Sequence, residues 1–200
     1  KTAAVQRSLE DVMSWFTPLT GVSAERVVLS VDKTLNLSTK AALDMLKPFD
    51  PKLTTAISND GDVKLQQQGL TFVNDTIFIL LDNIKSHSGL KNPEIRIKII
   101  VNDENNTLTI TCSNNTKQSE RARLKNEIDK IKNLIDKDIL GDRAKLEGRS
   151  GFIKLAASID KKDKGKLNFD LAVTGEFCLS ITNDLGIRQE PIEDVRVEDV

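Results

Sequence analysis

The segment from Glu94 to Val101, EIRIKIIV, alternates charged and apolar residues, and a second alternating segment, LTITCS, follows the turn NDENN. Alternation with a period of two is typical of a β-strand with one buried and one solvent-exposed face. Two such segments joined by a short polar turn predict an antiparallel hairpin. The buried face of this hairpin must be covered by other apolar elements of the chain, which restricts the fold to layered architectures.

Several other segments carry apolar residues at helical spacing, which is the pattern expected of helices that cover such a sheet. Residues 24–46 have Ser23 as a plausible N-cap, and residues 70–88 end before Gly89. The charged segment 119–138 has only a narrow apolar seam. Helices are therefore expected over residues 3–16, 24–46, 70–88 and 119–138, with another after the glycine-bearing segment at 147–151.

Two more hairpins are expected from alternating segments separated by turn residues. LTTAIS and DVKLQ flank the turn SNDGD, and LNFDLAV and EFCLSIT flank Thr174-Gly175. The predicted fold class is α+β: a two-layer α/β sandwich with a mixed, mostly antiparallel sheet and helices on one face, preceded by N-terminal helices. The expected division is an N-terminal helical segment (1–47), a central domain (48–183) and a polar C-terminal tail (184–200).

Composition excludes several functional classes. With 29 Lys+Arg, 30 Asp+Glu and a formal charge of −1, the chain lacks the basic excess of a nucleic-acid binder. We expect no nucleic-acid partner, and no membrane span, because no apolar run reaches about 18 residues. A single His excludes a multi-histidine metal site in this chain. Two cysteines fit a reducing compartment, so a cytoplasmic location is expected.

The helix predicted at 70–88 carries polar residues beside apolar ones in the sequence LLDNIKSHS. Asn83 and His87 are four residues apart and therefore project from one face of the helix. A carboxamide oxygen at Asn83 could coordinate Mg²⁺, which prefers oxygen ligands and shares them with phosphates. The alternative is a solvated helix end whose polar side chains have no ligand.

A second candidate is the segment EGRSGFIKL, residues 147–155, in which Gly148, Ser150 and Gly151 precede a predicted helix. Free backbone N–H groups and the positive end of the helix dipole favour an anion such as phosphate at this position. The segment lacks the Lys-Ser/Thr pair of a P-loop and the three-glycine spacing of a dinucleotide-binding fold. The alternative is an ordinary glycine-rich connection.

Taken in order, these segments resemble the GHKL ATP-binding fold of histidine kinases, gyrase and MutL. LLDNIKSHS resembles the N-box, TLTITCSNN the strand that leads to the adenine-binding residue, and EGRSGFIKL the G2 box. LNFDLAVTGEFCLSIT resembles the closing strand pair. The resemblance covers residues 53–182. It implies an ATP-binding module, with ATP or ADP and Mg²⁺ as ligands, within a larger signalling or stress-response protein.

The resemblance also implies roles for individual residues. Asn83 matches the asparagine that holds Mg²⁺ against the nucleotide phosphates, and His87 falls where a ring lines the nucleotide pocket. Asn114 falls where the adenine-reading residue stands, and its oxygen can accept a hydrogen bond from the adenine amino group. Gly148 and Gly151 match the loop whose amides meet the phosphates, with the segment 119–140 as a lid.

Departures from the family pattern limit the expected chemistry. Ile79 stands where hydrolytic members have a glutamate that activates water, so steady ATP hydrolysis is not expected and no catalytic residue is predicted. Thr116 stands near the position of a glycine, and Arg149 replaces a small residue. No acceptor His lies in residues 1–40. An acceptor could lie upstream or on a partner.

Two alternatives to simple ATP binding therefore stay open. One is an active kinase with its phosphoacceptor elsewhere. The other is a nucleotide-free scaffold or dimerisation module. A homodimer or upstream regulatory domains are possible partners.

Overall fold

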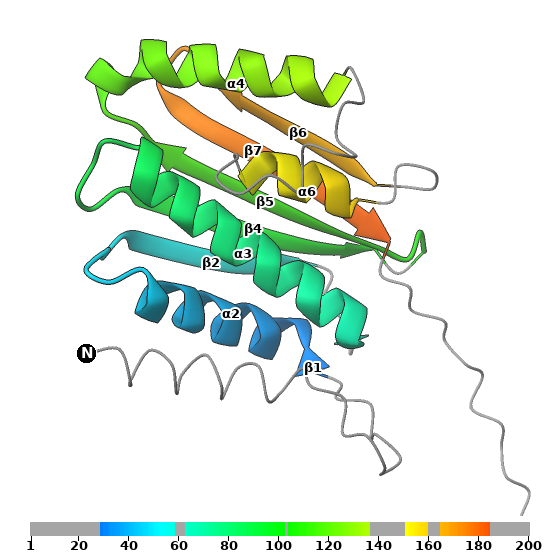
Figure 1. Cartoon of the computed structure of the whole chain (residues 1–200). Helices are drawn as coiled ribbons and strands as arrows, with labels where there is room; N and C mark the ends of the chain where they lie inside the picture. The colour runs from blue at the N-terminus through cyan, green and yellow to red at the C-terminus, as the bar shows by residue number, and fades with distance from the viewer. Residues whose placement is uncertain (1–28, 59–62, 103, 137–150, 160–164, 185–200) are drawn as a thin grey trace, which may run out of the picture.

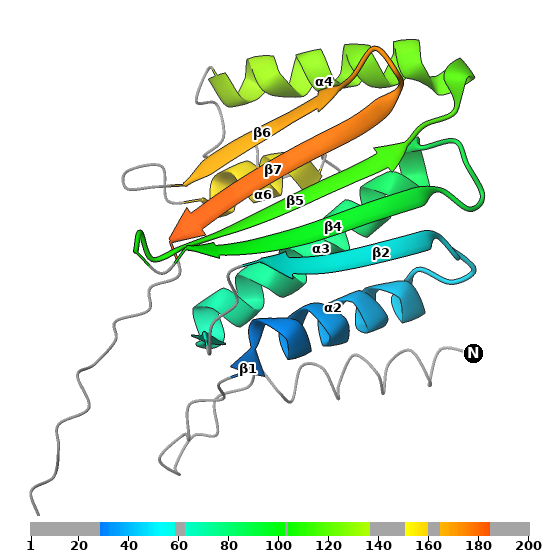
Figure 2. The ribbon, with the colours of Figure 1, turned by 180° about the vertical axis from the view of Figure 1, so that it is seen from behind.

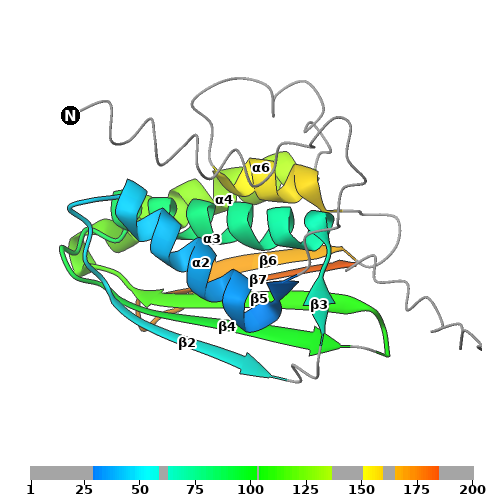
Figure 3. The ribbon, with the colours of Figure 1, turned by 90° about the horizontal axis from the view of Figure 1, so that it is seen from below.

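A computed structural model of the chain describes residues 29–58, 63–102, 104–136, 151–159 and 165–184. These residues form two layers, a twisted β-sheet and a set of helices packed on one of its faces (Figure 3). The predicted fold class, a two-layer α+β sandwich with a mostly antiparallel sheet, is confirmed.

The main sheet has five strands in the order β2-β4-β5-β7-β6 (Figure 1). β2 runs parallel to β4, and every other neighbouring pair is antiparallel. The central hairpin and the closing strand pair therefore form as the alternation predicts. The strands are β2 (Lys52–Ser58), β4 (Glu94–Asn102), β5 (Thr107–Asn115), β6 (Lys166–Leu171) and β7 (Glu176–Asp184).

The hairpin predicted from LTTAIS and DVKLQ is wrong. β3 (Lys64–Leu65) pairs with β1 (Leu29–Ser30) in a separate two-stranded sheet, whereas β2 pairs with β4. Parallel neighbours need a crossover connection, and the helix between β2 and β4 supplies it. Pattern alone does not distinguish the two pairings, because each segment alternates in the same way.

Four α-helices and one 3-10 turn are described: α2 (Val31–Met45), α3 (Gln67–His87), η1 (Gln118–Glu120), α4 (Arg121–Asp136) and α6 (Gly151–Ser158). α2 begins at residue 31 rather than 24, because Leu29 and Ser30 belong to β1. Ser30 is its N-cap and accepts a hydrogen bond from the Lys33 amide at 3.4 Å. The predicted N-cap Ser23 and helix 3–16 lie outside the described residues.

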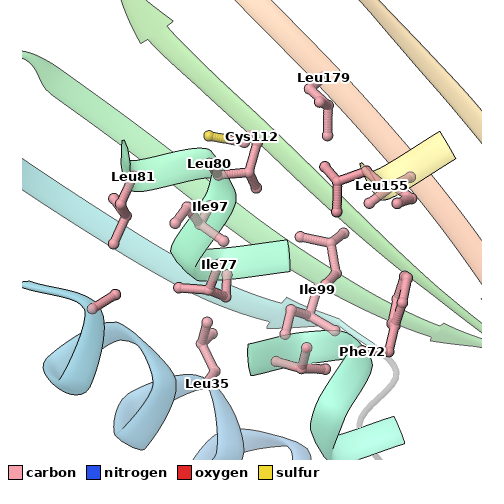
Figure 4. Packing of buried hydrophobic residues seen from close by; sticks show 14 of the residues in the cluster. Leu35, Phe72, Ile77, Leu80, Leu81, Ile97, Ile99, Cys112, Leu155 and Leu179 are labelled. Atoms are coloured by element: carbon pink, nitrogen blue, oxygen red, sulfur yellow. The ribbon is translucent and has the colours of Figure 1, made fainter. Parts of the chain in front are cut away.

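The core lies between the helices and the inner face of the sheet. On β4 the inner side chains alternate with exposed ones, and this row (Ile95, Ile97, Ile99 and Val101) is at most 1% exposed. Figure 4 shows side chains of α2, α3 and α6 meeting those of β4, β5 and β7. α3 contributes most to this contact from the helical layer, through Phe72, Val73, Ile77, Leu80, Leu81 and Ile84.

The opposite face of the sheet is polar, and no described helix covers it (Figure 2). Hydroxyl side chains line β5 and its neighbour β7 on this face, where Thr109 and Thr182 are hydrogen-bonded across the strands at 2.9 Å. The sheet therefore has one apolar and one solvent-facing surface, as the alternation of β4 predicts.

Substitution of neighbouring isoleucines on β4 tests this one-sided burial. Ile99 is fully buried, and Ile100 points to the polar face and is only partly buried. Ile99→Ala should lower the free energy of unfolding by about 2–5 kcal/mol, because it leaves a cavity in the core. Ile100→Ala should lower the free energy of unfolding by less than about 1.5 kcal/mol, because the partly buried side chain removes less apolar area from water. Denaturant melts measure both, and equal losses would contradict the assigned faces.

Candidate functional site

The structure brings Gly151, from the glycine-bearing segment, into contact with the helix that carries Asn83. Gly151 is the first residue of α6, and it packs against α3 at Ile79 and Asn83. A Cβ at position 151 would overlap the Ile79 side chain and would lie 2.9 Å from Asn83 Nδ2. Only glycine allows the two helices to approach so closely, so Gly151 lies beside Asn83 despite their separation in sequence.

The Asn83 side chain is half-buried and is oriented by its own helix. Its Nδ2 donates a hydrogen bond to the Ile79 carbonyl oxygen at 2.7 Å. This bond uses the donor end of the amide and leaves the carboxamide oxygen as the atom able to coordinate a cation. The chemistry of the side chain therefore fits the magnesium role implied by the family resemblance.

A small cavity lies between α3, the end of β5, α4 and α6, and it brings Asn83, His87 and Asn114 together. Its volume is about 20 Å³, which is room for a single water molecule. The full lining comprises Leu80, Asn83, Ile84, His87, Ser88, Asn114, Thr116, Leu124, Phe152 and Phe177. Three of the predicted site residues therefore share one space.

Asn114 is the most unusual group in this cavity. It continues the inward row of β5 after Leu108, Ile110 and Cys112, so it is only 3% exposed. Its Nδ2 donates to the Asn115 carbonyl at 2.8 Å, whereas its Oδ1 has no hydrogen-bond partner among the described residues. A buried acceptor without a partner costs about 1–3 kcal/mol, so a hydrogen-bond donor is expected to meet it.

His87 lines the same cavity from α3. Its Nδ1 atom is buried and lies 3.5 Å from Glu127 Oε2 on α4, too far for a good hydrogen bond. Glu127 is itself paired with Arg123 at 3.3 Å. The imidazole is therefore placed between α3 and α4 with a ring nitrogen that can still bond to a ligand or a water molecule.

Apolar side chains fill most of the space around these polar groups. Phe152 of α6 stacks on Phe177 with ring centroids 5.7 Å apart, and on Phe169 at 5.0 Å. Leu124 of α4 is 7% exposed and also lines the cavity. Sequence reasoning missed this group of apolar side chains because its members come from distant segments and no motif spacing connects them.

Thr116, which stands near the position of a family glycine, has a structural role. It is 5% exposed, and both its amide and its hydroxyl donate to the Gly175 carbonyl, at 3.2 and 2.6 Å. Gly175 lies beside the Arg121 guanidinium and has φ +87°, a backbone conformation that residues with a side chain rarely adopt. These two hydrogen bonds connect the end of β5 to the turn between β6 and β7.

Some predicted site residues cannot be placed. Gly148, Arg149 and Ser150, and the part of the lid segment from residue 137 onward, lie outside the described residues. The described part of that segment is α4, whose Leu124 and Ile128 are buried in the core. This half of the predicted lid is a packed helix.

α4 is also held to the sheet by charges on β6. Lys125 Nζ lies 2.8 Å from Asp170 Oδ1, and Lys132 Nζ lies 3.5 Å from Asp170 Oδ2 and 5.8 Å from the Phe169 ring centroid. The Lys125 hydrogen bond, a backbone hydrogen bond from Leu171 and the Lys132 charge lower the pKa of Asp170 to about 2. These contacts hold α4 over the cavity.

Among the described residues, no group of three or more His, Cys, Asp or Glu side chains is arranged to hold a metal ion. A magnesium ion at Asn83 would therefore need oxygen ligands from a bound phosphate and from water. Within the same residues, no helix is both long and apolar enough to span a lipid bilayer.

A family model described as "y4jQ C-terminal putative histidine kinase domain" matches residues 30–185. The chain belongs to this family. It is a histidine-kinase-like catalytic domain, which confirms the family-level resemblance found in the sequence. No curated protein sequence matches the chain.

Solved structures support the same fold for this histidine-kinase-like domain. A nucleotide-free catalytic domain of the histidine kinase ThkA matches with a TM-score of 0.53 at 11% identity, over 80% of this chain and 96% of that one. A second crystal form of ThkA gives 0.52 at 10% identity and the same coverage. At these identities the likeness shows the fold alone.

Replacing Gly151 tests the close contact between α3 and α6. Gly151→Ala should lower the free energy of unfolding by about 1–3 kcal/mol, because the new methyl group overlaps Ile79. Ile79→Ala in the same chain should recover part of this loss, and the double-mutant cycle should give a clear coupling energy. Additive losses in denaturant melts would show that the two residues do not touch.

Removing the charge of Asp170 tests the attachment of α4. Because the folded-state pKa of Asp170 lies below its unfolded value of about 4, its stabilising effect is complete above pH 4 and is lost as the pH falls toward 2. Asp170→Asn should speed hydrogen exchange in α4 modestly at neutral pH and remove this acid dependence. Asn168→Asp is a control on the same strand. Unchanged exchange in both variants would argue against the attachment.

Proposed function

We propose that this domain binds a purine nucleotide together with Mg²⁺, and that ATP or ADP is its ligand. The observation that carries the proposal is the Asn114 Oδ1 atom, which is buried and has no hydrogen-bond partner among the described residues. The hydrogen bond from Nδ2 to Asn115 fixes the amide, so the side chain presents only an acceptor to the cavity. The amino group of adenine is a donor of the matching kind.

The phosphates of the nucleotide would extend toward Asn83 and the first turn of α6. Gly151 opens that helix, and the free amides and the helix dipole at its start favour negative charge. The Asn83 oxygen would share Mg²⁺ with the phosphates. Bound Mg²⁺ would offset part of their charge, and this chain's own residues would orient the ligand.

Binding requires the cavity to enlarge, because ligand pockets usually measure 300 Å³ or more and this one measures about 20 Å³. We infer that α4 moves, since its Leu124 lines the cavity; the movement would uncover the buried Leu124 and Ile128 and break the ion pairs between exposed groups that join α4 to β6. Such exposed pairs contribute little stability. In this proposal the nucleotide displaces α4 and thereby reports its presence to neighbouring parts of the protein.

We further propose that the bound nucleotide is not hydrolysed. Ile79 contacts the Gly151 position and has no group that can take a proton from water. The domain would then act as a nucleotide-dependent sensor in a larger, cytoplasmic signalling or stress-response protein. An active kinase would need its phosphoacceptor upstream or on a partner, and labelled ATP with the longer protein would reveal a phosphoprotein in that case.

A second candidate function is a nucleotide-free scaffold or dimerisation module. The observation that favours it is the small volume of the cavity, about 20 Å³, with Leu124, Phe152 and Phe177 among its lining residues. A single water could then satisfy Asn114. This candidate predicts no response to any nucleotide.

Thermal unfolding with Mg-ATP separates the two functions. A ligand at about 100 times its Kd adds about 2.7 kcal/mol of stability, which raises Tm by about 5–10 °C in a domain of this size. Asn114→Leu should abolish this shift while leaving the ligand-free Tm unchanged or higher, since it removes an unpaired buried acceptor. Asn183→Leu is the control, because Asn183 is also buried in the inward row of β7 but does not line the cavity.

Calorimetry of wild type and Asn83→Ala with ATP, with and without Mg²⁺, tests the metal role. The variant should lose the part of the affinity that depends on Mg²⁺ and keep the rest. Equal heats for both proteins would remove the metal role, and no heat from either protein would support the nucleotide-free scaffold.

A further inference from the structure

The uncovered face of the sheet carries a broad hollow of about 900 Å³ that is separate from the nucleotide cavity. Strand register places its floor in two adjacent rows that cross all five strands. The first row is Thr54, Arg96, Ser113, Cys178 and Asp170. The second row is Ala56, Lys98, Thr111, Ser180 and Asn168. We call these two rows the transverse groove.

The transverse groove has a largely apolar lining surface, on which hydroxyl groups and an excess of positive charge are placed. Its cations are Arg96 and Lys98 on the floor and Lys132 on the wall formed by α4. Asp170 is its one lining carboxylate, and two lysines already neutralise it. Arg96 is paired with Glu176 at 3.2 Å. Lys98 has no ion-pair partner among the described residues, so the middle of the groove presents an unpaired cation beside the hydroxyl of Thr111.

The direction of the groove restricts its ligand. Because it crosses the strands rather than following a sheet edge, it offers side chains and no unpaired backbone groups. Recognition would therefore rely on hydroxyls and cations, which suit a carboxylate-rich segment.

The chain contains such a segment directly after β7. Residues 185–200 hold five carboxylates (Glu190, Glu193, Asp194, Glu198 and Asp199) and two arginines, a net charge of −3. The whole chain has a net charge of −1, so the remaining residues are positive by two. We propose that residues 185–200 bind in the transverse groove of the same molecule.

Distances permit this arrangement. β7 ends at Asp184, four residues after Ser180 in the groove, which is about 13 Å along a strand. Crossing five strands takes about 19 Å at the usual interstrand spacing. Sixteen residues can span roughly 53 Å when extended. The tether also raises the effective concentration of the segment at the groove to the millimolar range, so weak contacts suffice.

Cys178 lies on the groove floor and provides a native probe. It is exposed, whereas Cys112 is 2% exposed and burial raises the pKa of its thiol to about 12, which leaves it unreactive. Alkylation by iodoacetamide therefore reports on Cys178 alone. In the full chain the rate should be about fivefold or more below that of a variant whose five acidic residues 190, 193, 194, 198 and 199 are changed to their amides. Salt at 1 M should remove the difference, because it screens the charges.

Disulfide trapping adds a test that does not depend on the reactivity of Cys178 alone. In the Val197→Cys variant, the new cysteine should form an intramolecular disulfide with Cys178 under mild oxidation. The reaction should be several-fold faster than when the five acidic residues of the tail are also changed to their amides, which leaves the tether length the same. Lys98→Glu should slow it, and Cys178→Ser should abolish it. Equal rates in the two tail backgrounds would overturn the proposal. A concentration-dependent disulfide dimer would also overturn it, because the tail would then bind a second copy.

Discussion

One-sided burial of the five-stranded sheet determines where every other group can lie. On β4 and β5 the period of two sends alternate residues under the helices and the rest to the polar face. Asn114 is buried because it occupies the last inward position of β5, after three apolar residues. A shift of one residue would expose it and bury Ser113 instead. The register of the sheet therefore creates the buried acceptor on which the nucleotide proposal rests.

The helical layer then decides how much space surrounds that acceptor. Gly151 lets α6 approach α3 until it touches Ile79 and Asn83, which carries Phe152 into the cavity beside Phe177. The same close approach that unites the two motifs thus also narrows the cavity between them. A buried hydrogen-bond acceptor that has no donor partner and is surrounded by apolar side chains lowers the free energy of unfolding. In the nucleotide-binding proposal, a ligand that enters as α4 moves donates the missing hydrogen bond. In the nucleotide-free alternative, a trapped water molecule donates it.

Sequence patterns predicted the features that depend on local periodicity. The β4–β5 and β6–β7 pairs and helix α3 follow from alternation and helical spacing, whereas the meeting of Asn83 with Gly151 was implied by the family resemblance. The pairing of β2 was wrong because parallel neighbours leave no local signal. The Phe152–Phe177 stack and the Leu124 contact were missed for a related reason: they are packing relations between distant segments. Thr116 could be recognised as a departure from the family pattern, but its hydrogen bond to Gly175 depends on a turn 59 residues away.

α4 connects the two faces of the molecule at which ligands are proposed. Leu124 on one side lines the cavity proposed for the nucleotide, and Lys132 on the other lines the transverse groove and contacts Asp170. A nucleotide that displaces α4 must therefore alter the wall of the groove, and an acidic segment that competes for Lys132 must weaken the attachment of α4 to β6. Thermodynamic linkage makes such coupling reciprocal. If one ligand changes the affinity for the other by a certain factor, the second changes the affinity for the first by the same factor. A single packed helix is thus sufficient to relate occupancy of the cavity to occupancy of the opposite face.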